Sequence, residues 1–268
     1  MIDKKKNQNF DFGKNWEAFI HHINEYTIKE ATGSLQGALA LESFKGKSFL
    51  DVGCGSGLFS LAAMRLNAEE VYSFDCSTKS INGTRTLKYR YYRGSENWVI
   101  KQGSVLDTKF LFEIGTFDIV YSWGVLHHTG QMWQGLENVV PLVRRGGKLF
   151  IAIYNDQGMF SQMWKKVKKF HVGLPSWIKP VYVFSIMMIF EIRHCLRKML
   201  SRRKLERTQR KRGMNKYHDW VDWVGGWPFE VAKPEEIFEF YHRRGFQLEY
   251  LKTAGRGYGN NEFIFKKD

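Results

Sequence analysis

From residue 47 onward, short apolar runs alternate with longer stretches of helical pattern. Strands that are apolar throughout and alternate with helices are typical of a parallel sheet covered on both faces. Two helices are predicted between the first strands, one over Leu58–Leu66 and one from an N-cap at Ser77 to about Tyr92. We therefore expect a doubly wound α/β fold whose ligand lies beyond the carboxyl ends of the strands. The predicted strands are Lys47–Val52, Val71–Asp75, Trp98–Gln102, Phe117–Ser122 and Lys148–Ile153.

The alternating pattern stops after the fifth run and resumes near Trp220. A helix is predicted over Pro234–Gly245, with proline in its first turn and glycine at its end. Phe246–Lys252 and Asn261–Lys266 are predicted to form an antiparallel edge, which gives a mostly parallel seven-stranded sheet. The expected units are an N-terminal helical cap (1–46), a cofactor-binding core (47–154), a basic and aromatic helical insert (155–230), and a C-terminal helix with edge strands (231–268).

Composition limits the class of protein. The chain has 268 residues, of which 43% are hydrophobic and 16% aromatic, so collagenous, low-complexity and wholly disordered proteins are excluded. Its three cysteines are too few and too scattered for a disulfide framework or a metal knuckle, which favours a reducing compartment. The N-terminus is polar and lacks the apolar run of a signal peptide. We expect a cytoplasmic protein.

The net charge of +14 is concentrated in one segment. Between Ser161 and Lys216 there are 16 basic and two acidic residues, so the rest of the chain is neutral. The segment includes an apolar stretch over Trp177–Phe190 that is too short to span a membrane and is interrupted by Lys179 and Pro180. Residues 177–212 thus resemble an interfacial anchor for an anionic membrane surface. The alternatives are a lid over a substrate pocket and, less favoured, a surface for nucleic acid.

Acidic residues follow three successive predicted strands, beside a glycine-rich turn. The turn runs from Asp51 to Gly57 with glycines at 53, 55 and 57, which differs from the GxGxxG fingerprint of dinucleotide-binding proteins. Asp75, 24 residues after Asp51, could hold both hydroxyls of a ribose. Asp107 could accept a hydrogen bond from an adenine amino group. The structural alternatives are a helix cap for Asp75 and an ordinary turn for Asp107.

Together these motifs resemble those of class I S-adenosylmethionine-dependent methyltransferases, which have a Rossmann-like fold. The motifs are Leu50–Gly57, Phe74–Asp75, Gly103–Asp107, Phe117–Val120 and Gly146–Gly147. The resemblance implies that the turn holds the amino-acid portion of the cofactor, Asp51 its ammonium group, Asp75 its ribose and Asp107 its adenine. It further implies that Trp16 covers the cofactor, with core packing as the alternative. The complete expected cofactor set is Trp16, Asp51, Gly53, Cys54, Gly55, Gly57, Asp75, Cys76, Ser104, Val105, Asp107 and Trp123.

The segment after the fourth strand bears on the methyl acceptor. Enzymes that methylate exocyclic amines of bases carry an Asn/Asp-Pro-Pro-aromatic turn here, whereas this chain has Ser122-Trp123-Gly124-Val125. The segment instead resembles small-molecule enzymes such as quinone, sterol and sugar methylases. A neutral imidazole near pH 7 suits proton removal from an oxygen acceptor, so His127 and then His128 are candidate bases. Either histidine could instead pack or cap structurally, and proximity alone can drive such reactions.

A second cluster of titratable and aromatic residues lies at 217–230. Its composition is typical of a pocket wall for a flat or sugar-like acceptor, or of a Trp-rich core seam. His218 is a third candidate base, while Tyr154, Trp223 and Trp227 are expected to bind the acceptor. One histidine with two nearby acids is too little for a metal site, so none is expected.

The favoured function is methyl transfer from S-adenosylmethionine to oxygen on a small-molecule, lipid-linked or glycan acceptor, at the cytosolic face of a membrane. The alternatives are an RNA methyltransferase that binds phosphates through the basic insert and a non-catalytic cofactor-binding scaffold.

Overall fold

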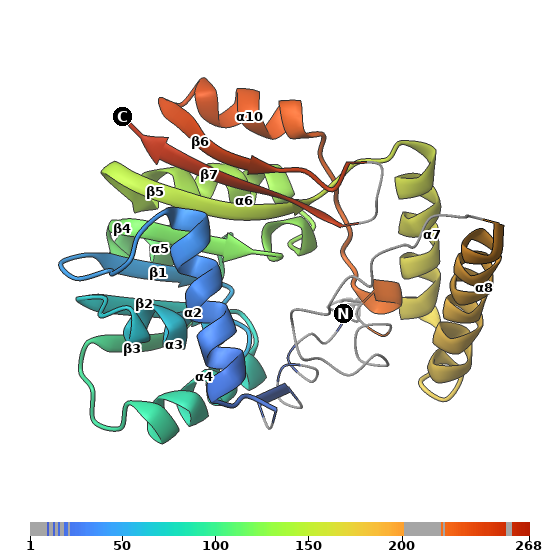
Figure 1. Cartoon of the computed structure of the whole chain (residues 1–268), viewed down its shortest axis with the longest axis horizontal. Coiled ribbons are helices and arrows are strands. Elements are labelled where there is room, and N and C mark those ends of the chain that lie inside the picture. The colour runs from blue at the N-terminus through green and yellow to red at the C-terminus, as the bar shows by residue number, and fades with distance from the viewer. Residues whose placement is uncertain are drawn as a thin grey trace, which may run out of the picture.

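A computed structural model of the chain shows a seven-stranded sheet with helices on both faces (Figure 1). The strand order is β3-β2-β1-β4-β5-β7-β6. The strands are β1 (Ser48–Val52), β2 (Glu70–Asp75), β3 (Trp98–Gln102), β4 (Phe117–Trp123), β5 (Val143–Tyr154), β6 (Phe246–Lys252) and β7 (Asn260–Lys267). The structure describes residues 10, 13, 16, 19, 20, 22–200, 221, 223–255 and 259–268.

The pairing confirms the predicted fold class. The pairs β1–β2, β1–β4, β2–β3 and β4–β5 are parallel, whereas β7 is antiparallel to both β5 and β6. The strand order reverses between β1 and β4, so the crevice at their carboxyl ends is where this type of sheet binds its ligand.

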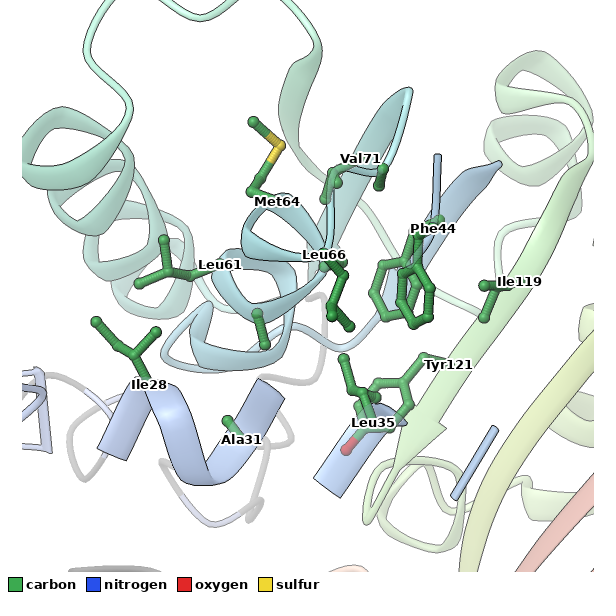
Figure 2. Close-up of a cluster of buried hydrophobic side chains, with 14 of the residues drawn as sticks. Ile28, Ala31, Leu35, Phe44, Leu61, Met64, Leu66, Val71, Ile119 and Tyr121 are labelled. Carbon is green, nitrogen blue, oxygen red and sulfur yellow. The ribbon is translucent and has the colours of Figure 1, made fainter. Parts of the chain in front are cut away.

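Helices α2 (Glu25–Leu39), α3 (Leu58–Arg65) and α4 (Thr78–Tyr91) cover one face of the sheet. Asn24 starts α2 by accepting a 3.0 Å hydrogen bond from the Thr27 backbone N–H. Figure 2 shows how Leu35 of α2 and Leu61 of α3 meet the side chains of this face, which include Tyr121 of β4. Because neighbouring strand residues point to opposite faces, Leu50 and Val120 belong to the core on the other side.

That second core lies beneath α5 (Thr108–Ile114), α6 (Met132–Val139) and α10 (Pro234–His242). Tyr241 of α10 is fully buried there and donates a 3.2 Å hydrogen bond to the carbonyl of Leu136. Short 3-10 turns, η1 (Leu126–His128) and η2 (Val140–Leu142), flank α6.

Two further helices, α7 (Met159–Gly173) and α8 (Lys179–Leu200), form a hairpin beyond the carboxyl ends of the parallel strands (Figure 1). A separate hydrophobic cluster joins the hairpin to the segment before α10: Trp164 of α7 and Val183 of α8 pack with Val224 and Phe229. In the part of the chain that the structure describes, no helix is both long and apolar enough to cross a membrane.

The predicted start of the fifth strand was wrong. We expected it at Lys148, after a Gly146–Gly147 turn, but β5 begins at Val143 and includes both glycines. Gly146 has a φ of 74°, and the pairing with β4 shifts in register here, so the glycines form an irregularity inside the strand.

Candidate functional site

The glycine-rich turn connects β1 to α3 at the carboxyl edge of the sheet. Gly53, Gly55 and Gly57 have φ values of 74°, 53° and 78°, a region that side chains with a Cβ avoid. A Cβ at Gly53 would lie 2.5 Å from Cγ1 of Val125, and one at Gly57 would lie 2.7 Å from Cγ2 of Thr84. The turn is therefore restricted to glycine, and it leaves backbone N–H groups at the start of α3 for a ligand.

Asp75 ends β2 beside this turn. Its carboxylate accepts hydrogen bonds from the backbone N–H of Gly55 at 3.0 Å and of Ser77 at 2.8 Å. Burial raises the pKa of Asp75, although both amides favour its ionised form. Ser77, not Asp75, is the N-cap of α4, as predicted. Asp75 thus fixes the turn and retains acceptor capacity for a ligand hydroxyl.

Asp51 lies under the same turn at the end of β1 and is buried. Ser60 Oγ donates a 2.5 Å hydrogen bond to Asp51 Oδ2. Burial raises the pKa of this carboxyl to about 7, with the negative charge of Asp75 adding to the effect and the Ser60 hydrogen bond opposing it. A cationic ligand group at this position would be favoured because it would neutralise a buried negative charge.

Trp16 packs against the turn. Its ring lies 3.0 Å from the position of a Cβ at Gly55 and meets Phe19 edge-on at 6.0 Å between centroids. Cys54 is buried, with Sγ 3.4 Å from Oγ1 of Thr84, whereas Cys76 is exposed. The structure thus places Trp16 beside the cradle, where it can cover a ligand as well as the core.

The remaining members of the expected cofactor set follow β3 and β4. Asp107 is exposed and is the N-cap of α5, because its side chain accepts a 3.1 Å hydrogen bond from the Phe110 backbone N–H. Ser104 Oγ accepts one from Leu106 N at 3.2 Å, and Val105 is buried. Trp123 is half-buried at the end of β4. Asp107 is therefore a helix cap, a role that the sequence suggested for Asp75 and not for Asp107, and its contact with adenine stays a prediction.

His127 and His128 lie in η1, directly after β4, and pack around Tyr154 at the end of β5. The ring centroids of His127 and Tyr154 are 4.0 Å apart, and those of His128 and Tyr154 are 5.4 Å apart. Burial, then His128, then Lys168 hold the pKa of His127 well below its usual value, while the Ala152 carbonyl opposes them. Burial and Lys168 lower the pKa of His128 to about 3, although the Pro228 carbonyl favours the protonated form. Both rings are neutral at pH 7.

Backbone contacts distinguish the two histidines. His127 Nδ1 lies 3.3 Å from the Tyr154 backbone nitrogen, and its Nε2 is buried without a partner. His128 Nδ1 lies 2.7 Å from the carbonyl oxygen of Pro228, which can only accept, so Nδ1 carries the proton and Nε2 is the accepting atom. The roles of His127 and His128 as bases stay predictions.

A small hollow lies beside Tyr154, the residue on which both histidines pack, and neither histidine is among the residues that line it. Tyr154 and Trp223 line it together with Lys168, as do Asn155, Gln157, Ser161, Trp164, Phe229 and Gly259. Trp227, which we expected to bind the acceptor, is not among the residues that line this hollow. Its backbone carbonyl accepts a 2.9 Å hydrogen bond from the Phe10 N–H. His218 lies outside the described residues. Within the described part of the chain, no cluster of side chains could hold a metal ion.

Lys168 is a site residue that the sequence reading missed. It is 1% exposed, donates a 2.5 Å hydrogen bond to the carbonyl of Trp223 and lies 5.0 Å from the ring centroid of Phe229. The helical spacing of Ser161, Trp164, Lys168 and His171, all buried on one side of α7, is the signal that identifies it.

Comparisons with known proteins agree with this geometry. Residues 50–149 match a family model described as a methyltransferase domain. A ubiquinone biosynthesis O-methyltransferase of Parvibaculum lavamentivorans is 31% identical over 131 residues, 48% of this chain and 49% of that protein. A tRNA U34 carboxymethyltransferase of Methylococcus capsulatus is 30% identical over 124 residues, 46% of this chain and 36% of that protein. The structure of the magnesium protoporphyrin IX methyltransferase of Synechocystis with bound SAH has a TM-score of 0.52 at 14% identity, covering 97% of this chain and 89% of that chain.

The fold and the glycine cradle define a class I methyltransferase domain. Residues 50–149 carry a methyltransferase domain, and S-adenosylmethionine is the cofactor that this domain implies. The resemblance seen in the sequence is thereby confirmed. The chain spans between 36% and 49% of the length of the first curated relatives that it matches.

Proposed function

We propose that this chain transfers the methyl group of S-adenosylmethionine to an oxygen atom of a small-molecule acceptor, with lipid-linked and glycan compounds included in that class. One observation carries the proposal. The Asp51–Gly55–Asp75 cradle and the His127–His128–Tyr154 cluster lie at the same carboxyl edge of the sheet, at the ends of the adjacent strands β1, β2, β4 and β5. A methyl donor and its acceptor need this adjacency.

Three features of the cradle suit the cofactor: the glycine turn, the Asp51 carboxylate and the Asp75 carboxylate. The turn excludes any Cβ, and two buried carboxylates lie beneath and beside it. In the proposal, Asp51 holds the ammonium group and Asp75 the ribose hydroxyls, while Trp16 covers the bound molecule. The cofactor supplies an electrophilic methyl group on a sulfonium.

In the proposal, side chains of this chain orient the acceptor hydroxyl and receive its proton. His128 Nε2 is proposed to accept the hydrogen of the acceptor hydroxyl, because Pro228 keeps the ring's proton on Nδ1. A pKa of about 3 makes this imidazole a weak base, so it orients the hydroxyl and receives the proton only as the new bond forms. His127 Nε2–H is proposed to donate to the acceptor, and Tyr154 with Trp223 to form the wall of its site.

The test has two stages. Calorimetric titration should show binding of S-adenosylmethionine and of its demethylated product, with clear weakening in Asp75→Asn. Transfer of a labelled methyl group is then measured with three fractions offered separately: small phenols and quinols, a membrane lipid extract, and bulk RNA. Absence of cofactor binding would overturn the proposal, and label in RNA alone would overturn the acceptor class and favour the RNA alternative. Cofactor binding without turnover on any fraction would favour a scaffold.

The proposal keeps a cytoplasmic location at the inner face of a membrane, which brings a lipid-linked acceptor within reach of the site.

A further inference from the structure

Helix α8 is apolar on two opposite sides. Its inner side packs on α7, where Phe190 stacks on Trp164 at 5.2 Å between ring centroids and Val183 is buried in the same cluster. Its outer side is also apolar but is exposed, with relative exposures between 39% and 66%. The outer residues are Val181, Phe184, Met188, Ile189 and Ile192.

The spacing of the outer residues makes them a continuous stripe. Steps of three and four residues place side chains one above the other on a helix, so the stripe runs along α8 from its first turn to Ile192. A helix that needed only to cover α7 would carry polar residues on its outer side. The exposed stripe therefore indicates contact with an apolar phase or partner.

Aromatic and basic side chains are exposed elsewhere in the same hairpin. Trp177, before α8, is 77% exposed, and Phe170 at the end of α7 is exposed and lies 5.4 Å from Tyr182 between ring centroids. Lys165, Lys166 and Lys169 are exposed on α7, which contains no acidic residue. Glu191 is the one acid in α8. The segment from Ser161 to Lys216 also carries the whole net charge of the chain.

We propose that the outer face of the α7–α8 hairpin docks on an anionic lipid membrane, with α8 in the plane of the interface. An exposed apolar stripe on a helix whose sequence also contains Lys179, Arg193, Arg197 and Lys198 is the composition of an interfacial helix. The positive charge complements the surface potential of an anionic leaflet, and the described helices are not of the kind that crosses a bilayer. A protein partner would be equally served by the apolar stripe, but it would not require this charge excess.

Docking in this way has a consequence for the site. The hairpin lies beyond the carboxyl edge of the sheet (Figure 1), and α7 supplies Trp164 and Lys168 to the hollow beside Tyr154. The lipid surface would therefore lie on the acceptor side of the molecule. The docking itself does not depend on the proposed methyl transfer, and each can fail without the other.

Sedimentation with vesicles tests the docking. We expect the whole chain to bind vesicles of phosphatidylcholine with phosphatidylserine at low salt, and to bind phosphatidylcholine alone at least about tenfold more weakly. The variant Phe184→Ser/Ile189→Ser should lose at least about tenfold in partition coefficient, since two apolar side chains are removed from the interface. Lys165→Gln/Lys166→Gln/Lys169→Gln should lower binding and flatten its salt dependence.

The matched control is Phe112→Ser, which removes a side chain that is 88% exposed on α5, away from the hairpin. It should bind vesicles as the unmodified chain does. Cofactor titration of every variant shows whether it is folded. The proposal is overturned if the unmodified chain stays off anionic vesicles, or if the stripe and control variants behave alike. It is also overturned if light scattering shows a dimer that the stripe variant dissociates while vesicle binding is absent.

Discussion

Ser60 Oγ donates a 2.5 Å hydrogen bond to Asp51 Oδ2, and this contact ends a buried chain that starts on β3. Trp98 Nε1 donates to Ser73 Oγ at 2.9 Å, and Ser73 Oγ donates to Ser60 Oγ at 2.7 Å. Every donor in the chain is directed toward the carboxylate, and all four residues are buried. Strands β1, β2 and β3 together with α3 thus fix one oxygen atom directly below the cofactor cradle.

Replacing the carboxylate of Asp51 should weaken cofactor binding and stabilise the fold. In Asp51→Asn we expect S-adenosylmethionine affinity to fall at least about tenfold, because the charged partner of the ammonium is lost. We expect the free energy of unfolding without cofactor at pH 8 to rise by about 1–4 kcal/mol, since burial disfavours the ionised carboxyl. Calorimetric titration and urea unfolding measure the two effects.

Asp118→Asn is the matched control for this variant. Burial alone would raise the pKa of Asp118, but hydrogen bonds from Ser48 and the charge of Arg144 outweigh it and lower the pKa. The ionised form of Asp118 therefore stabilises the fold, so its loss should decrease stability at pH 8 and leave cofactor affinity unchanged. Opposite signs for the two stabilities are the expected result, and a loss of stability in both variants would contradict the assignment of Asp51.

Cofactor affinity should depend on pH with a known sign. The pKa of Asp51 is raised to about 7, so its carboxyl becomes protonated as the pH falls below that value and no longer pairs with an ammonium. We expect affinity to weaken by up to about tenfold per unit below pH 7, and binding at about pH 6 to release a proton. Titrations in two buffers of different ionisation enthalpy measure this release. Affinity that stays constant from about pH 6 to pH 8 in the unmodified chain would contradict this role for Asp51.

Local sequence pattern was sufficient for most of the fold. Strands β3 and β6 begin and end at the residues that the apolar pattern predicts, and the acids at 51 and 75 lie beside the turn as expected. These features depend on nearby residues, because strand propensity, turn glycines and strand ends are local.

The roles of the histidines depend on distant residues and could not be predicted in the same way. The proton position on His128 is determined by Pro228, 100 residues later in the chain. Lys168, which lowers the pKa of both histidines, is held by the carbonyl of Trp223, 55 residues later. Contacts of this range follow from the packing of α7 against the segment before α10, which the sequence pattern does not specify.

The glycine cradle can be tested with two alanine variants that separate backbone strain from lack of space. Gly46 has a φ of 70° with nothing within 4 Å of a Cβ, so Gly46→Ala should cost only about 1–2 kcal/mol of stability. At Gly53 the φ is 74° and Val125 lies 2.5 Å from the Cβ position, so Gly53→Ala should cost more than Gly46→Ala and should also weaken cofactor binding. Thermal unfolding and titration of both variants measure this difference. Equal losses in the two variants would show that the space at Gly53 is not restricted.

The positive charge of Lys168 should lower the pKa of the neighbouring His128 ring. Lys168→Met keeps the aliphatic stem but removes the charge that disfavours a histidine cation, so the pKa of His128 should move upward from about 3. The variant also leaves the Trp223 carbonyl without this donor, at a cost of about 1–3 kcal/mol of stability. Nuclear magnetic resonance titration of the His128 ring measures the shift, and Lys169→Met, which removes the charge of the exposed neighbour, is the control. In the unmodified chain the low pKa keeps His128 neutral at pH values well above 3, so turnover at saturating S-adenosylmethionine should show no acid limb from this ring near the usual histidine value of 6.5. A limb at that pH which is absent from an active His128→Gln variant would show that His128 itself titrates there, and would contradict its low pKa.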